Sequence, residues 1–205
     1  GRQQNPLSAL SQWKIFDNLR RSLVPAVLTL LLLLGWTLLS PAWFWTWVVI
    51  GIILIPPLIA SILDLFRKPD DVLLGQHLSA ELRSTGGHLA QAVLTLACLP
   101  YEAYFSLDAI IRTNWRILVT HKRLLEWSPS GSSDRDDRTS LVAGYQSMWS
   151  APVISIASAV YLAASTPATL AVAGPILFLW IASPAIVWWI SRPLARREAR
   201  LTADQ

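Results

Sequence analysis

Four long apolar segments without Asp, Glu, Lys, Arg or His constrain this chain more than any other feature. They cover residues 22–39, 43–63, 148–164 and 168–190. An α-helix rises 1.5 Å per residue, so a segment of about 18 residues extends about 27 Å, close to the thickness of the hydrocarbon core of a bilayer. The sequence therefore predicts an all-α integral membrane protein with four transmembrane helices.

The composition agrees with a lipid bilayer as the main partner. Charged residues make up 15% of the chain, below the share of about 25% in soluble proteins. Eleven tryptophans gather at the ends of the apolar segments, where an indole ring suits the headgroup level. The net charge of +4 is small, and basic residues beside apolar segments more often face anionic lipid. We therefore expect no nucleic-acid partner.

The positions of the charges predict how the four segments are connected. The turns at 40–42 and 165–167 contain no ionisable residue, so each joins two segments into a hairpin. All 17 Lys and Arg then lie on one side of the membrane, four before the first segment, nine between the hairpins and four after the last. The positive-inside rule makes that side cytoplasmic, and we expect both termini there.

A domain plan follows from this topology. Residues 1–21 are expected to form a pre-membrane helix, either interfacial or simply solvated. The first hairpin covers 22–64, and the second covers 146–191. Residues 65–145 are expected to form a cytoplasmic-face insert of amphipathic helices, with a flexible loop at 128–140, and 192–205 a cytoplasmic linker.

An alternative fifth span at 89–111 is disfavoured by two observations. It would place Glu102 and Asp108 in the hydrocarbon, where each carboxylate costs about 2–3 kcal/mol unless it is paired or lines a cavity. It would also move the four C-terminal arginines to the outside, against the positive-inside rule.

Few residues carry a recognisable chemistry. His77, His88 and His121 do not have the spacing of metal ligands, and Cys98 lies in an apolar run. The run Asp134-Arg135-Asp136 has the D-x-D spacing of some metal sites, but a solvated charge run is the better interpretation in a Ser/Gly-rich loop. We predict no metal site and no catalytic residue in this chain.

The best polar cluster lies in the middle of the insert. Its residues are candidates for docking a glycan or a catalytic domain: Tyr101, Glu102, Tyr104, Asp108, Arg112, Arg116 and Trp127. Asp108 and Arg112 are four residues apart, so they are expected to pair on a helix. The competing interpretation is structural ion pairing with lipid phosphate contacts.

The run WKIFDNLRRSLVP at 13–25 resembles the entry into the membrane after the transferase domain of the bacterial cyclic β-1,2-glucan synthase family. The runs LPYEA at 99–103, SLDAI at 106–110 and RT at 112–113 with RLLEW at 123–127 are similar to its segment between later spans. ISRP at 190–193 is similar to its exit from the last span.

The resemblance implies a fragment of a large inner-membrane glycosyltransferase, downstream of its catalytic domain. The family implies a transferase that uses UDP-glucose and a divalent metal for cyclic β-1,2-glucan synthesis, and a glycoside-phosphorylase domain that trims the product. The transferase's acidic metal-binding motif and its Gln-x-x-Arg-Trp motif are missing from this sequence. Transferase and phosphorylase domains of the same parent protein, and the growing glucan, are therefore expected partners, and catalysis by this chain alone stays open.

The function expected from the sequence is a membrane anchor and scaffold for such a glucosyltransferase. Two alternatives stay open, a small transport or channel component and a purely structural membrane protein. Prolines at 56–57, 175 and 184 would kink the helices of a transport path.

Overall fold

The computed structural model describes residues 8–66, 74–121 and 140–192, and every regular element in these ranges is a helix. The all-α prediction is therefore confirmed. The elements in chain order are α1 (Ala9–Thr37), α2 (Ala42–Phe66), α3 (Leu74–Trp115), the π-helix η1 (Arg116–Thr120), α4 (Leu141–Ser147), α5 (Ser150–Ser165), the 3-10 turn η3 (Pro167–Thr169) and α6 (Leu170–Ile190).

The first helix joins two segments that the sequence separates. The hydroxyl of Ser8 caps α1 by accepting the amide of Ser11 at 3.2 Å, and the helix then continues to Thr37. Pro25 lies in the interior of α1. Proline bends a helix without necessarily ending it when neighbouring groups tolerate the lost hydrogen bond. The pre-membrane helix and the first apolar segment are thus one element.

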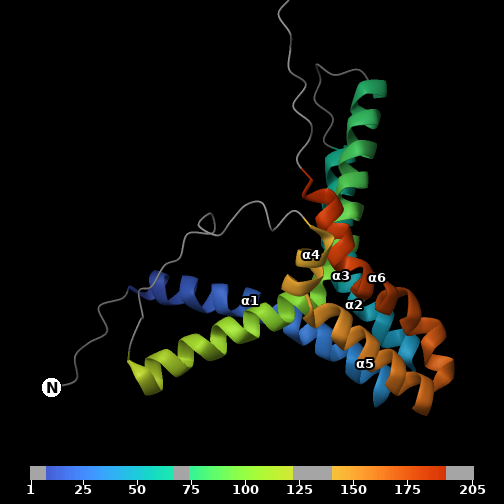
Figure 1. The fold of residues 1–205 in the computed structure, drawn as a ribbon. Helices are drawn as coiled ribbons and strands as arrows, with labels where there is room; N and C mark the ends of the chain where they lie inside the picture. Colours follow the sequence, from blue (N-terminus) through green and yellow to red (C-terminus); the bar gives the residue numbers. More distant parts are fainter. Residues whose placement is uncertain (1–7, 67–73, 122–139, 193–205) are drawn as a thin grey trace, which may run out of the picture.

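The third helix differs most from expectation. Glycine and proline both disfavour a helix interior, yet α3 runs for 42 residues through Gly86-Gly87 and Pro100. Figure 1 shows that α3 bends sharply in its middle, the part of the helix that contains Pro100. A proline at this position has no amide to donate to the carbonyl of Leu96, four residues earlier. The indole Nε1 of Trp180 donates to that carbonyl instead, at 3.0 Å, so α6 completes the bonding of the broken turn.

The bend in α3 divides the molecule into a bundle and two arms. In Figure 1 the first half of α3 runs beside the second half of α2 and forms an upper arm. The second half of α3 leaves the bundle on the same side as the first half of α1, and both views show this side arm. The turns between α1 and α2 and between α5 and α6 lie at the same, lower end of the bundle in Figure 1.

The core lies where α1, α2, α3, α5 and α6 meet. The rings of Trp36 and Trp180 lie 5.5 Å apart at 47°, and both side chains are buried. The indole of Trp36 donates to the hydroxyl of Thr46 at 2.9 Å. Close approach of α1 and α2 also depends on Gly35, since a Cβ there would lie 2.5 Å from the Cβ of Trp45.

In the described part of the chain, four helices are long and apolar enough to cross a membrane, and three of them correspond to predicted segments, whereas α3 stands in place of the predicted segment at 148–164. The four are Ala9–Thr37, Ala42–Phe66, Gly75–Thr120 and Pro167–Ile190. The helix α5 reaches that length only together with α4, from which it is bent by 72°. Two hairpins flanking an amphipathic insert are therefore not confirmed, because the expected insert contains α3. The domain boundaries stay predictions, and the loop at 128–139 and the linker beyond Arg192 lie outside the described residues.

Candidate functional site

The predicted polar cluster lies along the second half of α3, and the structure distributes its members over several faces. Asp108 and Arg112 form an ion pair with Nε and Oδ1 2.7 Å apart, as the spacing predicts. The Arg112 side chain is 68% exposed and that of Asp108 33% exposed. This pair is open to water or to a partner, and it contributes little to stability by itself.

Tyr101 is the predicted residue that lines a groove. Its ring stacks on Phe105 at 6.2 Å and 27°, because residues four apart share one face of a helix. Both rings form the α3 wall of a groove of about 630 Å³ between α3, α4 and α6, within the size range of small-molecule sites. The full lining is Tyr101, Phe105, Ala143, Gly144, Ser147, Met148, Pro184, Val187, Trp188, Ser191 and Arg192.

The other predicted members lie elsewhere. Tyr104 packs edge-on against Trp149 at 5.2 Å and helps to hold α3 against the start of α5. Glu102 is half-buried on α3, and Arg116 is half-buried at the start of η1. Trp127 lies outside the described residues. Of the members that the structure describes, only Tyr101 lines the groove, and the docking role of the cluster stays a prediction.

The walls contributed by α4 and α6 were not predicted from the sequence. The Arg192 guanidinium lies 3.7 Å from the ring centroid of Trp188, a cation–π contact. The hydroxyl of Tyr145 donates to the carbonyl of Ile181 at 3.1 Å and fixes α4 to α6. The sequence does show a Trp and an Arg four residues apart at the end of an apolar segment, which could have indicated the α6 wall. Nothing in the sequence places α3 beside them.

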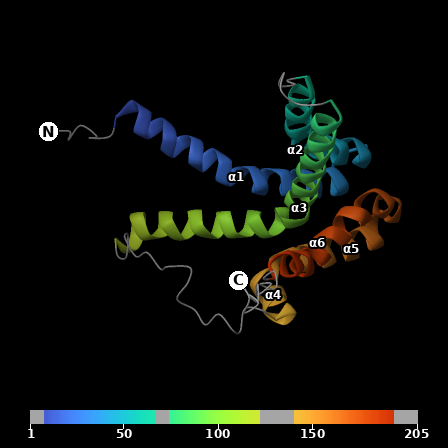
Figure 2. The ribbon, with the colours of Figure 1, turned by 90° about the horizontal axis from the view of Figure 1, so that it is seen from above.

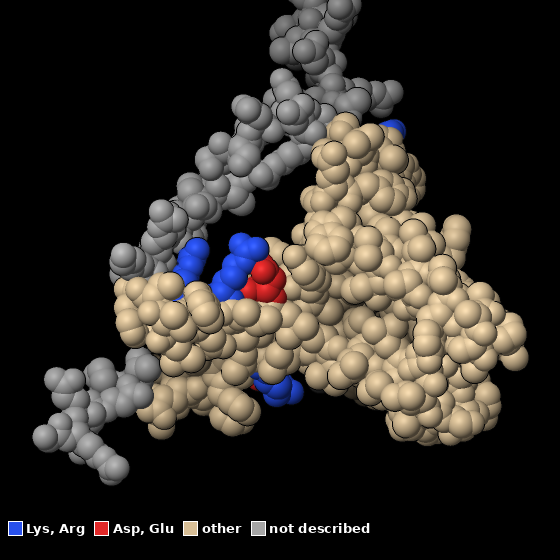
Figure 3. All heavy atoms as spheres, turned by 60° about the horizontal axis from the view of Figure 1, so that its bottom comes forward, with Lys and Arg blue, Asp and Glu red and all other residues tan. Residues whose placement is uncertain are grey.

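Charged side chains gather on one part of the visible surface. Figure 3 shows Lys, Arg, Asp and Glu mainly over the side arm formed by the first half of α1 and the second half of α3. Asp17 pairs there with Arg20 at 2.9 Å and with Arg21 at 2.7 Å. The side arm therefore carries most of the charged side chains visible in this view, together with exposed apolar side chains such as Trp13, Phe16 and Trp115.

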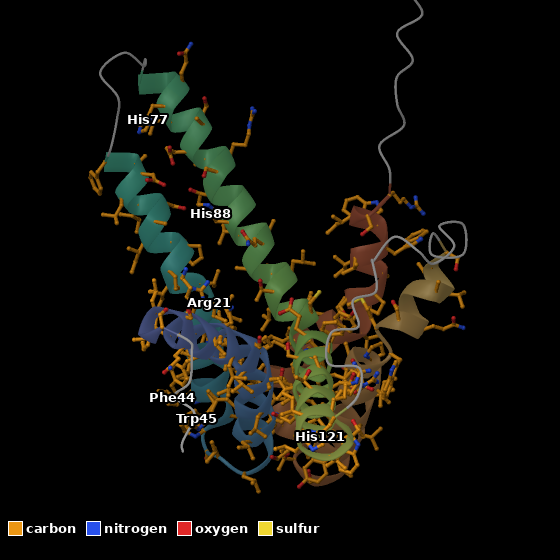
Figure 4. All side chains as sticks on the ribbon, turned by 90° about the vertical axis from the view of Figure 1, so that its left-hand side faces the viewer. Arg21, Phe44, Trp45, His77, His88 and His121 are labelled. Carbon is orange, nitrogen blue, oxygen red and sulfur yellow. The ribbon has the colours of Figure 1, made fainter. Side chains whose placement is uncertain are left out.

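Two of the three histidines, His77 and His88, join α2 to α3. Figure 4 shows His77 and His88 along the upper arm and His121 far from both. His88 Nδ1 lies 2.9 Å from the Ser61 hydroxyl, and His77 Nε2 lies 3.2 Å from the Leu65 carbonyl. Among the described residues, no three His, Cys, Asp or Glu side chains come together as metal ligands, and the run 134–136 lies outside them.

Comparison with known proteins confirms the family resemblance. The chain is 28% identical over 204 residues to cyclic beta-(1,2)-glucan synthase NdvB from Rhizobium meliloti (strain 1021). The match covers 98% of this chain and 7% of the relative, so the chain spans a small part of that protein's length. No family model matches the chain. The sequence is therefore similar, along nearly its whole length, to one segment of a glucan synthase.

Proposed function

We propose that this chain is the membrane module of a glucosyltransferase that makes cyclic β-1,2-glucan. The observation that carries the proposal is continuous similarity to one segment of a glucan synthase, in a chain whose helices are apolar and long enough to cross a bilayer. In this proposal the module lies in the bacterial inner membrane with both termini in the cytoplasm. It anchors and positions catalytic domains.

The side arm is the proposed docking surface for those domains. It carries the exposed Asp108–Arg112 pair, with Arg116 one helical turn further on. Glu102, Tyr104 and Trp127 lie in or beyond the same helix and are the remaining docking candidates. A charged surface that is mostly solvent-exposed favours a polar partner domain over burial in lipid.

The chemistry is proposed to belong to the partner domains. A transferase domain would bind UDP-glucose and a divalent metal, and a phosphorylase domain would trim the glucan. The membrane module would keep both domains at the bilayer. Fixing their relative position there raises the effective concentration of the reacting groups.

A segment exchange in the relative tests this proposal. The matched segment of the R. meliloti synthase is replaced by this chain, and cyclic glucan formed from UDP-glucose is measured in isolated membranes. A matched control carries an unrelated four-helix membrane segment of similar length. We expect glucan from the exchange with this chain and little from the control.

The control also separates specific positioning from simple anchoring. Equal glucan yield from both proteins would leave only an anchoring role. A membrane-inserted but inactive exchange with this chain would contradict the proposal.

A further inference from the structure

The groove between α3, α4 and α6 changes from apolar to polar along its length. Its α6 wall is one helix face, formed by Pro184, Val187, Trp188, Ser191 and Arg192, which recur at helical spacing. The first two are apolar, and the last two, at the end of the helix, carry a hydroxyl and a guanidinium. The groove therefore has an apolar interior and a cationic end.

The α3 and α4 walls keep the interior apolar. Tyr101 and Phe105 present stacked rings from α3, and Met148 is buried beside them. On α4, the Ser147 hydroxyl already donates to the Gly144 carbonyl at 3.0 Å. Apart from the Tyr101 hydroxyl, the side chains that α3 and α4 contribute to the interior are apolar or already hydrogen-bonded, so the interior suits a hydrocarbon chain better than a polar molecule.

The lining chemistry argues against a glucan in this groove. Sugar hydroxyls both donate and accept hydrogen bonds, so a site that binds them needs acceptors as well as donors. None of the described lining residues is Asp, Glu, Asn, Gln or His. The hydroxyls of Tyr101, Ser147 and Ser191 are the side-chain acceptors among the described lining residues, so a neutral sugar would lose its hydration and recover only part of its hydrogen bonds.

The Arg192 guanidinium forms the cationic end of the groove. Within the described part of the chain, no carboxylate lies within ion-pair distance of Arg192. Its guanidinium covers the Trp188 ring at 3.7 Å, which fixes its position and leaves N–H donors for an anion. A Trp–Arg pair at the end of an apolar helix has the chemistry of the headgroup level.

We propose that this groove is a binding site for an anionic phospholipid, with an acyl chain along the apolar interior and the phosphate at Arg192. The site uses one lipid at a fixed position, unlike general attraction of basic residues to an anionic surface. The proposed lipid site requires only that the protein lies in a membrane. Its test is therefore independent of the proposed role in glucan synthesis.

Lipid preference of the purified full chain tests the site. Phosphatidylglycerol or phosphatidylcholine with the same acyl chains is titrated into detergent-solubilised protein. Native mass spectrometry counts bound lipid, and the thermal unfolding midpoint is followed in parallel. Both lipids carry a phosphate, but the choline cation of phosphatidylcholine competes with Arg192 for it, whereas phosphatidylglycerol has no such cation. We therefore expect one retained phosphatidylglycerol, a higher midpoint than with phosphatidylcholine, and about tenfold tighter apparent binding.

Three variants separate this site from general surface charge. Arg192→Gln removes the cation at an exposed position and should abolish the tenfold preference. Arg83→Gln removes the same charge from an exposed position on the first half of α3 and should leave the preference unchanged. Ser147→Trp fills the groove from the exposed side of α4 and should remove the retained lipid.

Several results would overturn the proposal. One is equal binding of phosphatidylglycerol and phosphatidylcholine. Another is an equal loss of the phosphatidylglycerol preference in Arg192→Gln and Arg83→Gln, and a third is a phosphatidylglycerol preference that remains in Arg192→Gln. A midpoint raised by a β-1,2-glucan oligosaccharide and lost in Ser147→Trp would assign the groove to glycan instead.

Discussion

The hydrogen bond from Trp180 to the Leu96 carbonyl allows a sharp test of how the bent helix is stabilised. In Trp180→Phe an aromatic ring remains in the core, but the donor to this carbonyl is lost. The side chain at 180 is fully buried, so water cannot easily replace the indole. The hydrogen bond itself is part-buried, and leaving such an acceptor unpaired costs about 1–3 kcal/mol, in addition to the loss of ring volume.

Trp36→Phe is the matched control for ring volume. Trp36 is also buried, and its ring packs against the ring of Trp180. The two Trp→Phe substitutions therefore remove similar apolar area. The Thr46 hydroxyl, which accepts from Trp36, also donates to the Ala42 carbonyl at 3.0 Å and keeps a partner. We therefore expect Trp180→Phe to lower the free energy of unfolding by about 1–3 kcal/mol more than Trp36→Phe.

Pro100→Ala completes a double-mutant cycle. Alanine at 100 restores an amide that can donate to the Leu96 carbonyl, so the loss of the indole should matter less in that background. We expect Trp180→Phe to cost about 1–2 kcal/mol less there than in the native sequence. The free energy of unfolding is measured by titrating denaturing detergent into mixed micelles and following helix content.

Two outcomes would refute this reasoning. One is equal destabilisation by Trp180→Phe and Trp36→Phe. The other is a Trp180→Phe cost that is the same with proline and with alanine at position 100. Either result would mean that packing alone holds α6 against the bend.

Three further predictions concern packing, docking and topology. Gly35→Ala should destabilise by about 1–3 kcal/mol, because its Cβ would lie 2.5 Å from the Cβ of Trp45. Gly86→Ala, with no atom within 4 Å of its Cβ, should instead stabilise by about 0.5–1 kcal/mol in the same titration. Asp108→Asn should change the unfolding free energy by less than about 0.5 kcal/mol but lower glucan yield in the segment exchange, and an unchanged yield and glucan length would remove the docking role. The proposed topology keeps α3 out of the bilayer, so in a cysteine-free background Ser40→Cys should react with a membrane-impermeant maleimide from the periplasm, whereas Asp136→Cys should not. The reverse pattern would contradict the proposed cytoplasmic location of both termini.

The sequence predicts the helices better than it predicts how they are joined. Apolar segments and charge-free turns identify where α1, α2 and α6 lie, because burial in lipid leaves a strong compositional signal. They do not reveal that α3 continues through Gly86-Gly87 and Pro100, since the lost bond is replaced by a side chain from α6. Local propensity is overridden there by a tertiary contact.

The candidate site was predictable only in part, for the same reason. The Asp108–Arg112 pair follows from spacing within one helix. The groove needs the relative placement of three helices, and its α6 wall lies more than 80 residues from Tyr101 in the chain. Periodicity within one segment carries no information about such a neighbour.

The bond between Trp180 and Leu96 joins residues 84 positions apart, which has a consequence for biosynthesis. At about 5–20 residues per second, the ribosome needs about 4–17 s to add the tryptophan after the leucine. Until then the Leu96 carbonyl of the nascent chain lacks the indole donor that it has in the folded protein. The last apolar helix therefore acts as the closing step of assembly, and quality-control proteases should preferentially degrade chains that stall before it.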